Sequence, residues 1–151
     1  MAISLKEALA RTQPMPRLDE AVLEGRAELL DSFDRQLLLA AWLHNQPAAR
    51  LAELTGRSPR VLRRRLRRIL RHLHSRAFVE AARALPMLKG DQAAVARLHL
   101  LQMRSARQTA RAAGLSYHRV RRLLDEVRAI IQARSSDPQG RSSAPGEWRC
   151  P

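Results

Sequence analysis

Arginine is the side chain with the clearest chemical role in this sequence, and the arginines concentrate in one stretch. Residues 57–76 contain nine arginines and no aspartate or glutamate. A guanidinium group donates forked hydrogen bonds to the oxygens of a phosphate or to O6 and N7 of guanine, which a lysine ammonium cannot do. This stretch therefore predicts the binding of a polyanion, with nucleic acid as the leading candidate.

The charge of the whole chain is uneven in a way that favours the same partner. The 151 residues carry a net charge of +14, and the isoelectric point is about 11.7. Residues 1–34 hold four basic and seven acidic side chains, whereas residues 35–134 hold twenty-two basic and five acidic ones. A solvated surface without a partner is the alternative, but like charges this dense repel one another unless something neutralises them.

One amphipathic helix is predicted to carry these arginines, over residues 58–76 (SPRVLRRRLRRILRHLHSR). Its apolar residues recur at three- and four-residue steps that share one helix face, and they are Leu62, Leu66, Ile69, Leu70 and Leu73. Ser58 suits the N-cap and Pro59 the first helical turn. The helix could continue through Ala84, because no helix breaker occurs before Pro86.

Further helical patterns lie on both sides of this helix. They are expected at residues 3–12, 19–30, 33–45, 48–55, 91–103, 106–113 and 116–134. Gly56 and Gly114 each follow a short helix, where glycine readily adopts a positive φ.

The two ends of the chain differ from its centre. The helix at 19–30 is acidic, with Leu18, Val22, Leu29 and Leu30 loosely aligned on one face. It is expected to cover the core of the following helices, and pairing with a second copy in a homodimer is the alternative. Residues 135–151 are rich in serine, proline and glycine, and are predicted to be a disordered tail.

A shift of 58 residues lays the second part of this pattern on the first without a gap. The matched pairs are Ala52 with Ala110, Gly56 with Gly114, Ser58 with Ser116, Leu62 with Val120, Arg63 with Arg121, Arg64 with Arg122 and Leu66 with Leu124. Two helices that cross closely need a small residue at their contact, here Ala52 or Ala110. The turn between them needs a left-handed residue, Gly56 or Gly114, and an apolar residue, Leu62 or Val120, packs the second helix against the first. Arg65 lies where Leu123 packs in the other copy, so Leu66 is expected to take over that packing.

The sequence therefore predicts an all-α fold with two tandem helix-turn-helix units. The expected bounds are an N-terminal acidic helical segment at 1–32, a first unit at 33–85, a second unit at 86–134 and the disordered tail at 135–151.

Residues 50–73 (RLAELTGRSPRVLRRRLRRILRHL) resemble the C-terminal helix-turn-helix of bacterial sigma-70-type factors, region 4. That family has a similar glycine, capping serine and long basic helix, with a further helix before them, as residues 33–45 would supply. Residues 109–133 resemble the same class more distantly. No equivalent of the promoter-melting sigma segment is found, and few aromatic residues are available to stack on melted bases. The resemblance implies a transcriptional regulator that reads double-stranded DNA with two recognition helices, rather than a working sigma factor.

In this motif the second helix enters the major groove, and its first two turns reach the base edges. The base-contacting candidates are Arg60, Arg63, Arg64, Arg67, Tyr117, His118, Arg121 and Arg122. The phosphate-contacting candidates are Arg57, Arg68, Arg71, Arg107 and Arg119. Because Asp125 and Glu126 make the second helix partly acidic, we expect the first unit to supply more affinity and the second more discrimination. If both units face one side of the duplex, half-site centres should lie about 10 base pairs apart.

Catalysis, a cofactor and a metal are not expected. The carboxylates are scattered, and His72 and His74 point away from each other on a helix. Cys150 is the single cysteine, which excludes an intramolecular disulfide and a cysteine metal cluster. No signal peptide or membrane span is found, so a cytoplasmic, nucleoid-associated location without a membrane partner is expected.

Three alternatives stay open at this point. One unit could bind RNA polymerase or another transcription factor in place of DNA, as sigma-region-4-like domains also do. Arginine-rich helices also bind structured RNA, although the paired glycine turns favour duplex DNA. The chain could also be the DNA-binding part of a recombinase or transposase, but no catalytic residue set is visible.

Overall fold

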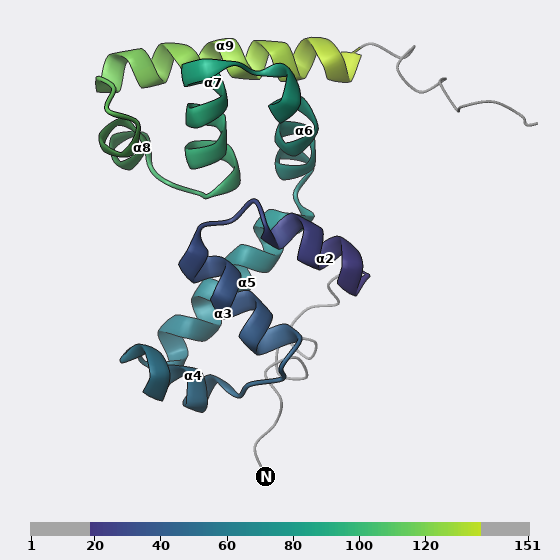
Figure 1. The fold of residues 1–151 in the computed structure, drawn as a ribbon, viewed down its shortest axis with the longest axis vertical. Helices are drawn as coiled ribbons and strands as arrows, with labels where there is room; N and C mark the ends of the chain where they lie inside the picture. Colours follow the sequence, from purple (N-terminus) through teal and green to yellow (C-terminus); the bar gives the residue numbers. More distant parts are fainter. Residues whose placement is uncertain (1–18, 137–151) are drawn as a thin grey trace, which may run out of the picture.

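The computed structural model describes residues 19–136, and within them every regular element is a helix (Figure 1). The α-helices are α2 (Glu20–Ala27), α3 (Ser32–Trp42), α4 (Ala48–Thr55), α5 (Pro59–His74), α6 (Arg76–Ala84), α7 (Gly90–Val95), α8 (Ala106–Ala113) and α9 (Tyr117–Ser136). A 3-10 turn covers Leu85–Met87, and a π-helix (Ala96–Leu101) continues α7. The helix expected at residues 3–12 lies outside the described residues, as does the expected tail from residue 137 onward. Ser135 and Ser136, which were expected in the tail, are instead the last residues of α9.

The arginine-rich helix is shorter than the expected one. Ser75 has an extended backbone (φ −68°, ψ 141°), which ends α5 and makes Ser75 the N-cap of α6. Its hydroxyl donates to the carbonyl of His72 at 2.7 Å and accepts from the amide of Phe78 at 3.2 Å. Serine side chains compete with the helical backbone for hydrogen bonds in this way. The expected amphipathic helix is therefore confirmed over Pro59–His74, with Ser58 as its N-cap, whereas its continuation through Ala84 was the wrong expectation.

Two other helices differ from expectation in detail. In α2 the buried face is formed by Leu23 and Ala27, with Leu30 following, whereas Val22 is 41% exposed. Val22 was therefore wrongly placed on the apolar face, whereas Leu29 and Leu30 do pack on the core and Leu18 lies outside the described residues. Helix α2 covers the core as expected, since it packs on α3 and α5. The helix expected at 91–103 starts at Gly90 and changes from α to π geometry at Ala96.

The 58-residue shift also holds for the backbone. It maps the bounds of α4 onto those of α8, and the first residue of α5 onto the first residue of α9. It also pairs the left-handed residues, which are Gly56 (φ 65°) with Gly114 (φ 66°) and Asn45 (φ 46°) with Met103 (φ 55°). The turns before α4 and α8 repeat as well: the amide of Gln46 donates to Ala40 O at 3.0 Å, and that of Arg104 to Leu98 O at 3.1 Å. Both copies therefore turn the chain in the same way.

The repeat extends to a fourth helix in each copy. The shift carries α2 onto residues 78–85, which α6 largely covers, and pairs the buried residues Leu23 with Ala81 and Leu30 with Leu88. We call α2–α5 the N-terminal half and α6–α9 the C-terminal half, and Figure 1 shows them as the lower and upper parts of the molecule. Helix α6, expected in the first unit, packs on the π-helix and α9 as well as on α5.

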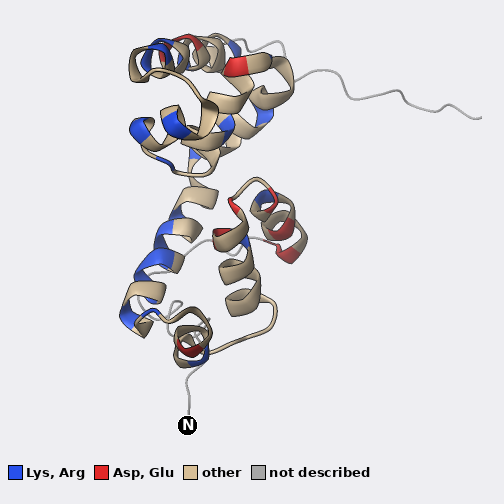
Figure 2. Cartoon of the chain, turned by 60° about the vertical axis from the view of Figure 1, so that its left-hand side comes forward, with Lys and Arg blue, Asp and Glu red and all other residues tan. Residues whose placement is uncertain are grey.

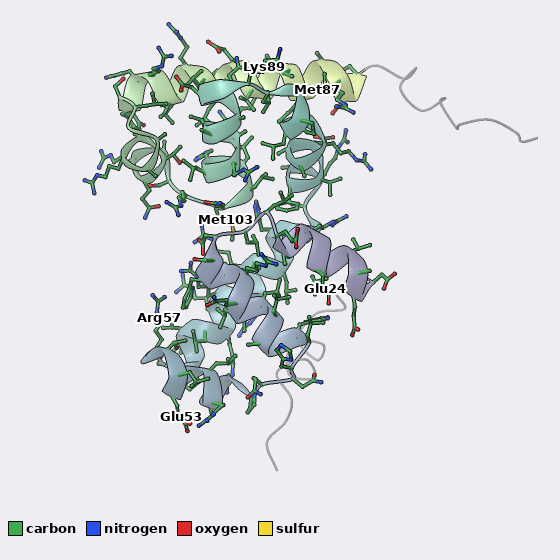
Figure 3. The ribbon with its side chains drawn as sticks, in the orientation of Figure 1. Glu24, Glu53, Arg57, Met87, Lys89 and Met103 are labelled. Carbon is green, nitrogen blue, oxygen red and sulfur yellow. The ribbon has the colours of Figure 1, made fainter. Side chains whose placement is uncertain are left out.

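The two halves are in direct contact. One hydrophobic cluster spans both halves: it joins residues of α2–α5 to Phe78, Ala81 and Leu101 of the C-terminal half, and Met103 and Ile131 pack against it. His72 Nε2 on α5 lies 3.1 Å from the carbonyl oxygen of Leu101, and a carbonyl can only accept, so this nitrogen carries the proton. Figure 3 shows Met103 at the junction between the halves.

Candidate nucleic-acid interface

A left-handed glycine sets how α5 follows α4. Gly56 has φ 65° and ψ 18°, and a Cβ built on it would meet nothing within 4 Å. Glycine is therefore favoured here by the backbone angle and not by lack of space. The hydroxyl of Ser58 then accepts from the amide of Val61 at 3.4 Å, which caps α5 as expected. The result is a short helix, a tight turn and a long helix.

Helix α5 has the two faces that the sequence indicates. Its five expected core residues are all at most 2% exposed. Four arginines on the remaining surface are exposed and have no acidic partner in the described part of the chain: Arg60, Arg63, Arg64 and Arg67. In Figure 2 the basic residues run along one side of this helix. These guanidinium groups are therefore available to an external anion.

The expected phosphate-contacting residues of the N-terminal half differ in their surroundings. The Arg57 Cζ lies 4.6 Å from the centroid of the Phe33 ring, a cation–π arrangement that ties the turn to α3 (Figure 3). Arg71 Nε donates weakly to Arg67 O at 3.4 Å. Arg68 is exposed and lines a cavity between the halves.

An ion pair with a buried carboxylate occupies a place where the packing of the two halves differs. Arg65 Nε donates to Asp34 Oδ1. The side chain of Asp34 is 4% exposed and that of Arg65 37%. The hydrogen bond to Asp34 raises the pKa of Arg65, which stays charged. In the C-terminal half the same two positions hold Gln92 and Leu123.

Leu66 is buried, and so is Leu124, its equivalent. At the position of Leu123 the N-terminal half has Arg65, whose charge is compensated by Asp34. An aspartate 31 residues earlier in the sequence gave no local signal of this pairing. That Leu66 takes over the packing of Leu123 stays a prediction.

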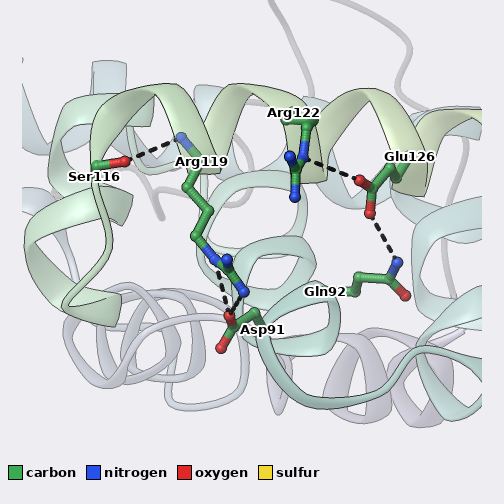
Figure 4. Close-up of polar contacts among 6 residues, drawn as sticks. All are labelled: Asp91, Gln92, Ser116, Arg119, Arg122 and Glu126. Atoms are coloured by element: carbon green, nitrogen blue, oxygen red, sulfur yellow. Dashed lines mark hydrogen bonds and ion pairs between the residues drawn. The ribbon is translucent and has the colours of Figure 1, made fainter.

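In the C-terminal half the exposed arginines of α9 have intramolecular partners (Figure 4). Arg119 donates to Asp91 Oδ2 through Nε at 3.2 Å and Nη2 at 2.8 Å. Arg122 Nε lies 3.4 Å from Glu126 Oε1, and the other oxygen of Glu126 accepts from Gln92 Nε2 at 3.1 Å. These pairs compete with any external anion for the same guanidinium groups.

The remaining candidates of α9 form a small polar group at its start. Arg121 Nη1 donates to the hydroxyl of Tyr117 at 3.3 Å, which raises the pKa of Arg121. The rings of Tyr117 and His118 meet edge-on, with their centroids 5.9 Å apart. Ser116 caps the helix, because its hydroxyl accepts from the amide of Arg119 at 3.2 Å. All three candidates, Tyr117, His118 and Arg121, are exposed.

Helix α8 contributes one arginine that the sequence analysis missed. Arg107 and Arg111 are one turn apart, and both are exposed without an acidic partner in residues 19–136. Two arginines at i and i+4 of an expected helix share a face, and that spacing could have identified Arg111. In Figure 2 the blue residues of α8 lie on the same side of the view as the arginines of α5.

Comparisons with protein families, curated proteins and solved structures reveal no match to this chain. Within the described residues, no helix combines the length and apolar content that crossing a bilayer requires. The same residues contain no cluster of three histidine, cysteine or acidic side chains that could hold a metal ion. The residues that stand out chemically are therefore the unpaired arginines.

Proposed function

We propose that this protein is a sequence-specific, double-stranded DNA-binding regulator of transcription. The observation that carries the proposal is the exposed row of Arg60, Arg63, Arg64 and Arg67, which has no acidic partner in the described part of the chain. It lies on a long helix directly after a tight glycine turn, and a helix of this diameter fits the major groove. In this proposal α4–α5 and α8–α9 act as tandem helix-turn-helix units, and Arg63 and Arg64 read guanines.

The two units contribute unequally in this proposal. Helix α5 supplies unpaired guanidinium groups, which bind phosphates and release counterions. Helix α9 must first give up the pairs of Arg119 and Arg122 with Asp91 and Glu126. In Figure 1 α9 lies across the long axis of the molecule and α5 runs closer to that axis, so a straight duplex would meet the two helices differently. Both features favour α5 as the main source of affinity.

A second candidate function follows from the paired arginines of α9. The C-terminal half would then bind another protein of the transcription apparatus, such as RNA polymerase, while the N-terminal half alone binds DNA. A surface with Asp125 and Glu126 among its arginines suits a protein partner better than a polyanion. The two candidates differ in one outcome, namely whether neutralising Arg121 and Arg122 changes DNA affinity.

The proposal is tested by selecting bound sequences from a pool of random duplexes and then measuring affinity for the selected duplex. The double variant Arg63→Ala/Arg64→Ala should weaken binding greatly at fixed salt, with Arg76→Ala/Arg83→Ala as a control that removes the same charge from exposed positions of α6. If six to ten phosphates are contacted, affinity should fall by a factor of about 10³–10⁵ between 50 and 200 mM salt. Equal affinity of the two double variants, or binding that ignores salt, would refute the proposal.

A further inference from the structure

A cavity of about 320 Å³ lies between the two halves. Its lining includes Arg65 and Arg68 from α5, Arg104 from the segment that leads into α8, and Gln108 from the first turn of α8. Each water molecule takes up about 30 Å³ in the liquid, so the space holds a ligand the size of a phosphate group together with several waters. The cavity exists only because the halves pack against each other.

The charged side chains that line the cavity are three arginines and two aspartates, which leaves a net charge of +1. Asp34 is paired with Arg65. Asp31, the other lining carboxylate, accepts from the amide of Asp34 at 2.9 Å as the N-cap of α3, where the helix dipole favours a negative charge. Arg68 and Arg104, one from each half, have no acidic partner in the described part of the chain. Two arginines that line one cavity, one from each half, suit an anion.

The backbone that carries Arg104 is held in a strained conformation. Met103 has φ 55°, a left-handed angle that costs a non-glycine residue about 1–2 kcal/mol. The turn is fixed on both sides of Arg104: its amide donates to Leu98 O at 3.1 Å, and His99 Nδ1 donates to its carbonyl at 2.7 Å. Strain of this kind persists where the surroundings enforce it, and it is common at binding sites.

Gln102, one of the lining residues, has a buried side-chain oxygen, Oε1, without a hydrogen-bond donor within the described residues. A buried polar atom without a partner costs free energy. Because this oxygen has almost no accessible surface, the amide end of Gln102 would have to turn toward the cavity before a ligand or water there could donate to it.

We propose that this cavity binds a phosphate group between Arg68 and Arg104. The group belongs either to a nucleic-acid backbone that passes the junction or to a phosphorylated small molecule. In both cases the anion bridges α5 and the start of α8, and so fixes how the two halves sit relative to each other. The site adds to the proposed function in the first case and is independent of it in the second.

The test uses the full chain and the variant Arg104→Gln, with Arg97→Gln as the matched control. Arg97 is exposed on the π-helix and does not line the cavity. In the first arm, pyrophosphate is titrated at constant ionic strength and backbone amide shifts are followed by NMR. Saturable shifts at residues 68 and 102–108 are expected for the natural chain and the control, and their loss in Arg104→Gln.

The second arm measures duplex binding as a function of salt. If the phosphate belongs to a nucleic-acid backbone, Arg104→Gln should lower the slope of log affinity against log salt by about one, whereas Arg97→Gln leaves it unchanged. A pyrophosphate response with an unchanged slope assigns the site to a phosphorylated small molecule. The same response in a chain that binds no duplex would refute the proposed function and leave the cavity site intact.

The inference is overturned if the natural chain shows no pyrophosphate response and Arg104→Gln leaves the salt slope of duplex binding unchanged. A pyrophosphate response that persists in Arg104→Gln also overturns it. A circular dichroism melting curve for each variant shows whether it is folded. If Arg104→Gln unfolds, Arg104→Lys takes its place, because it keeps the charge but loses the forked hydrogen bonds. It should then bind pyrophosphate several-fold more weakly, and unchanged binding would also overturn the inference.

Discussion

The two halves of the molecule share a backbone design but use their arginines differently. Both have a short helix, a left-handed glycine near φ 65° and a long helix with a capping serine. On α5 the outward arginines have no acidic partner among the described residues, whereas on α9 Arg119 and Arg122 are paired with Asp91 and Glu126. The comparison teaches that one helical frame can present available cations or neutralised ones, depending on a few acidic residues nearby.

The packing beneath the long helix also differs between the halves, and here the N-terminal half has the paired charges. The N-terminal half buries an ion pair between Arg65 and Asp34 where the C-terminal half has Leu123 and Gln92. The half with the more available surface charge therefore has the more polar core contact. An arginine at position 65 adds to the charge of α5, and Asp34 makes its partial burial tolerable.

The largest expected effect concerns the arginine pairs at equivalent positions of the two long helices. Arg63→Ala/Arg64→Ala should weaken duplex binding by about 2–6 kcal/mol, because each bidentate base contact is worth about 1–3 kcal/mol. Arg121→Ala/Arg122→Ala should cost less, because Arg121 and Arg122 already have partners. Both are measured with the selected duplex at one salt concentration. A larger loss from the α9 pair would reverse the proposed ranking of the halves.

The second effect concerns the buried ion pair. Arg65→Leu should lower the free energy of unfolding by about 2–4 kcal/mol, because it leaves the carboxylate of Asp34 buried without its partner. Asp34→Gln/Arg65→Leu imports the residues of the C-terminal half and should recover most of that loss. Urea unfolding measures both. If the double variant is no more stable than the single one, the ion pair is not the reason for the loss.

A smaller effect is expected at a position where the C-terminal half is the more polar one. Thr109 is fully buried, its hydroxyl has no partner within residues 19–136, and Leu51 is its equivalent in the N-terminal half. Thr109→Val keeps the shape and removes the unsatisfied hydroxyl, so it should raise the free energy of unfolding by about 1 kcal/mol. Thr55→Val is the control, because the Thr55 hydroxyl donates to Leu51 O at 2.7 Å. Removing that hydrogen bond should lower the free energy of unfolding.

The smallest effect concerns the contact between the halves. Burial lowers the pKa of His72, against the opposing hydrogen bond to Leu101 O, and Arg68 lowers it further. His72 therefore takes up a proton near pH 6.5 in the unfolded chain, but only at a lower pH in the folded chain. Stability should be complete above that pH and fall as the pH drops through the lowered pKa of His72. The free energy of unfolding should depend less on pH between 7.5 and 5 in His72→Gln than in His118→Gln, the control that removes an exposed histidine. Unfolding curves recorded across this pH range measure the difference.

Local sequence signals predicted the parts of the fold that local physics decides. Helix α4, the glycine turns at positions 56 and 114, and the core face of α5 are confirmed, because turn glycines, capping serines and apolar periodicity act within a few residues. The break at Ser75 was missed, although serine is a known cap. Arginines and apolar residues continue on both sides of it, so the periodicity alone showed no interruption.

The residues of the candidate site could be chosen from the sequence, but which of its arginines form ion pairs could not. The sequence placed Arg119 among the phosphate-contacting candidates and Arg60, Arg63 and Arg122 among the base-contacting ones, and the DNA-binding roles of all four remain predictions. Only the fold brings Asp91 to Arg119, across 28 residues, and Asp34 to Arg65, across 31.

The sequence by itself determined an all-helical chain with a repeated turn and a basic centre, since helix periodicity, capping and composition are properties of neighbouring residues. The tertiary structure alone decided which arginines are neutralised and that Arg68 and Arg104 meet at one cavity. The physical reason is that electrostatic pairing depends on distance in space, and residues far apart along the chain come within a few ångströms only when the helices pack.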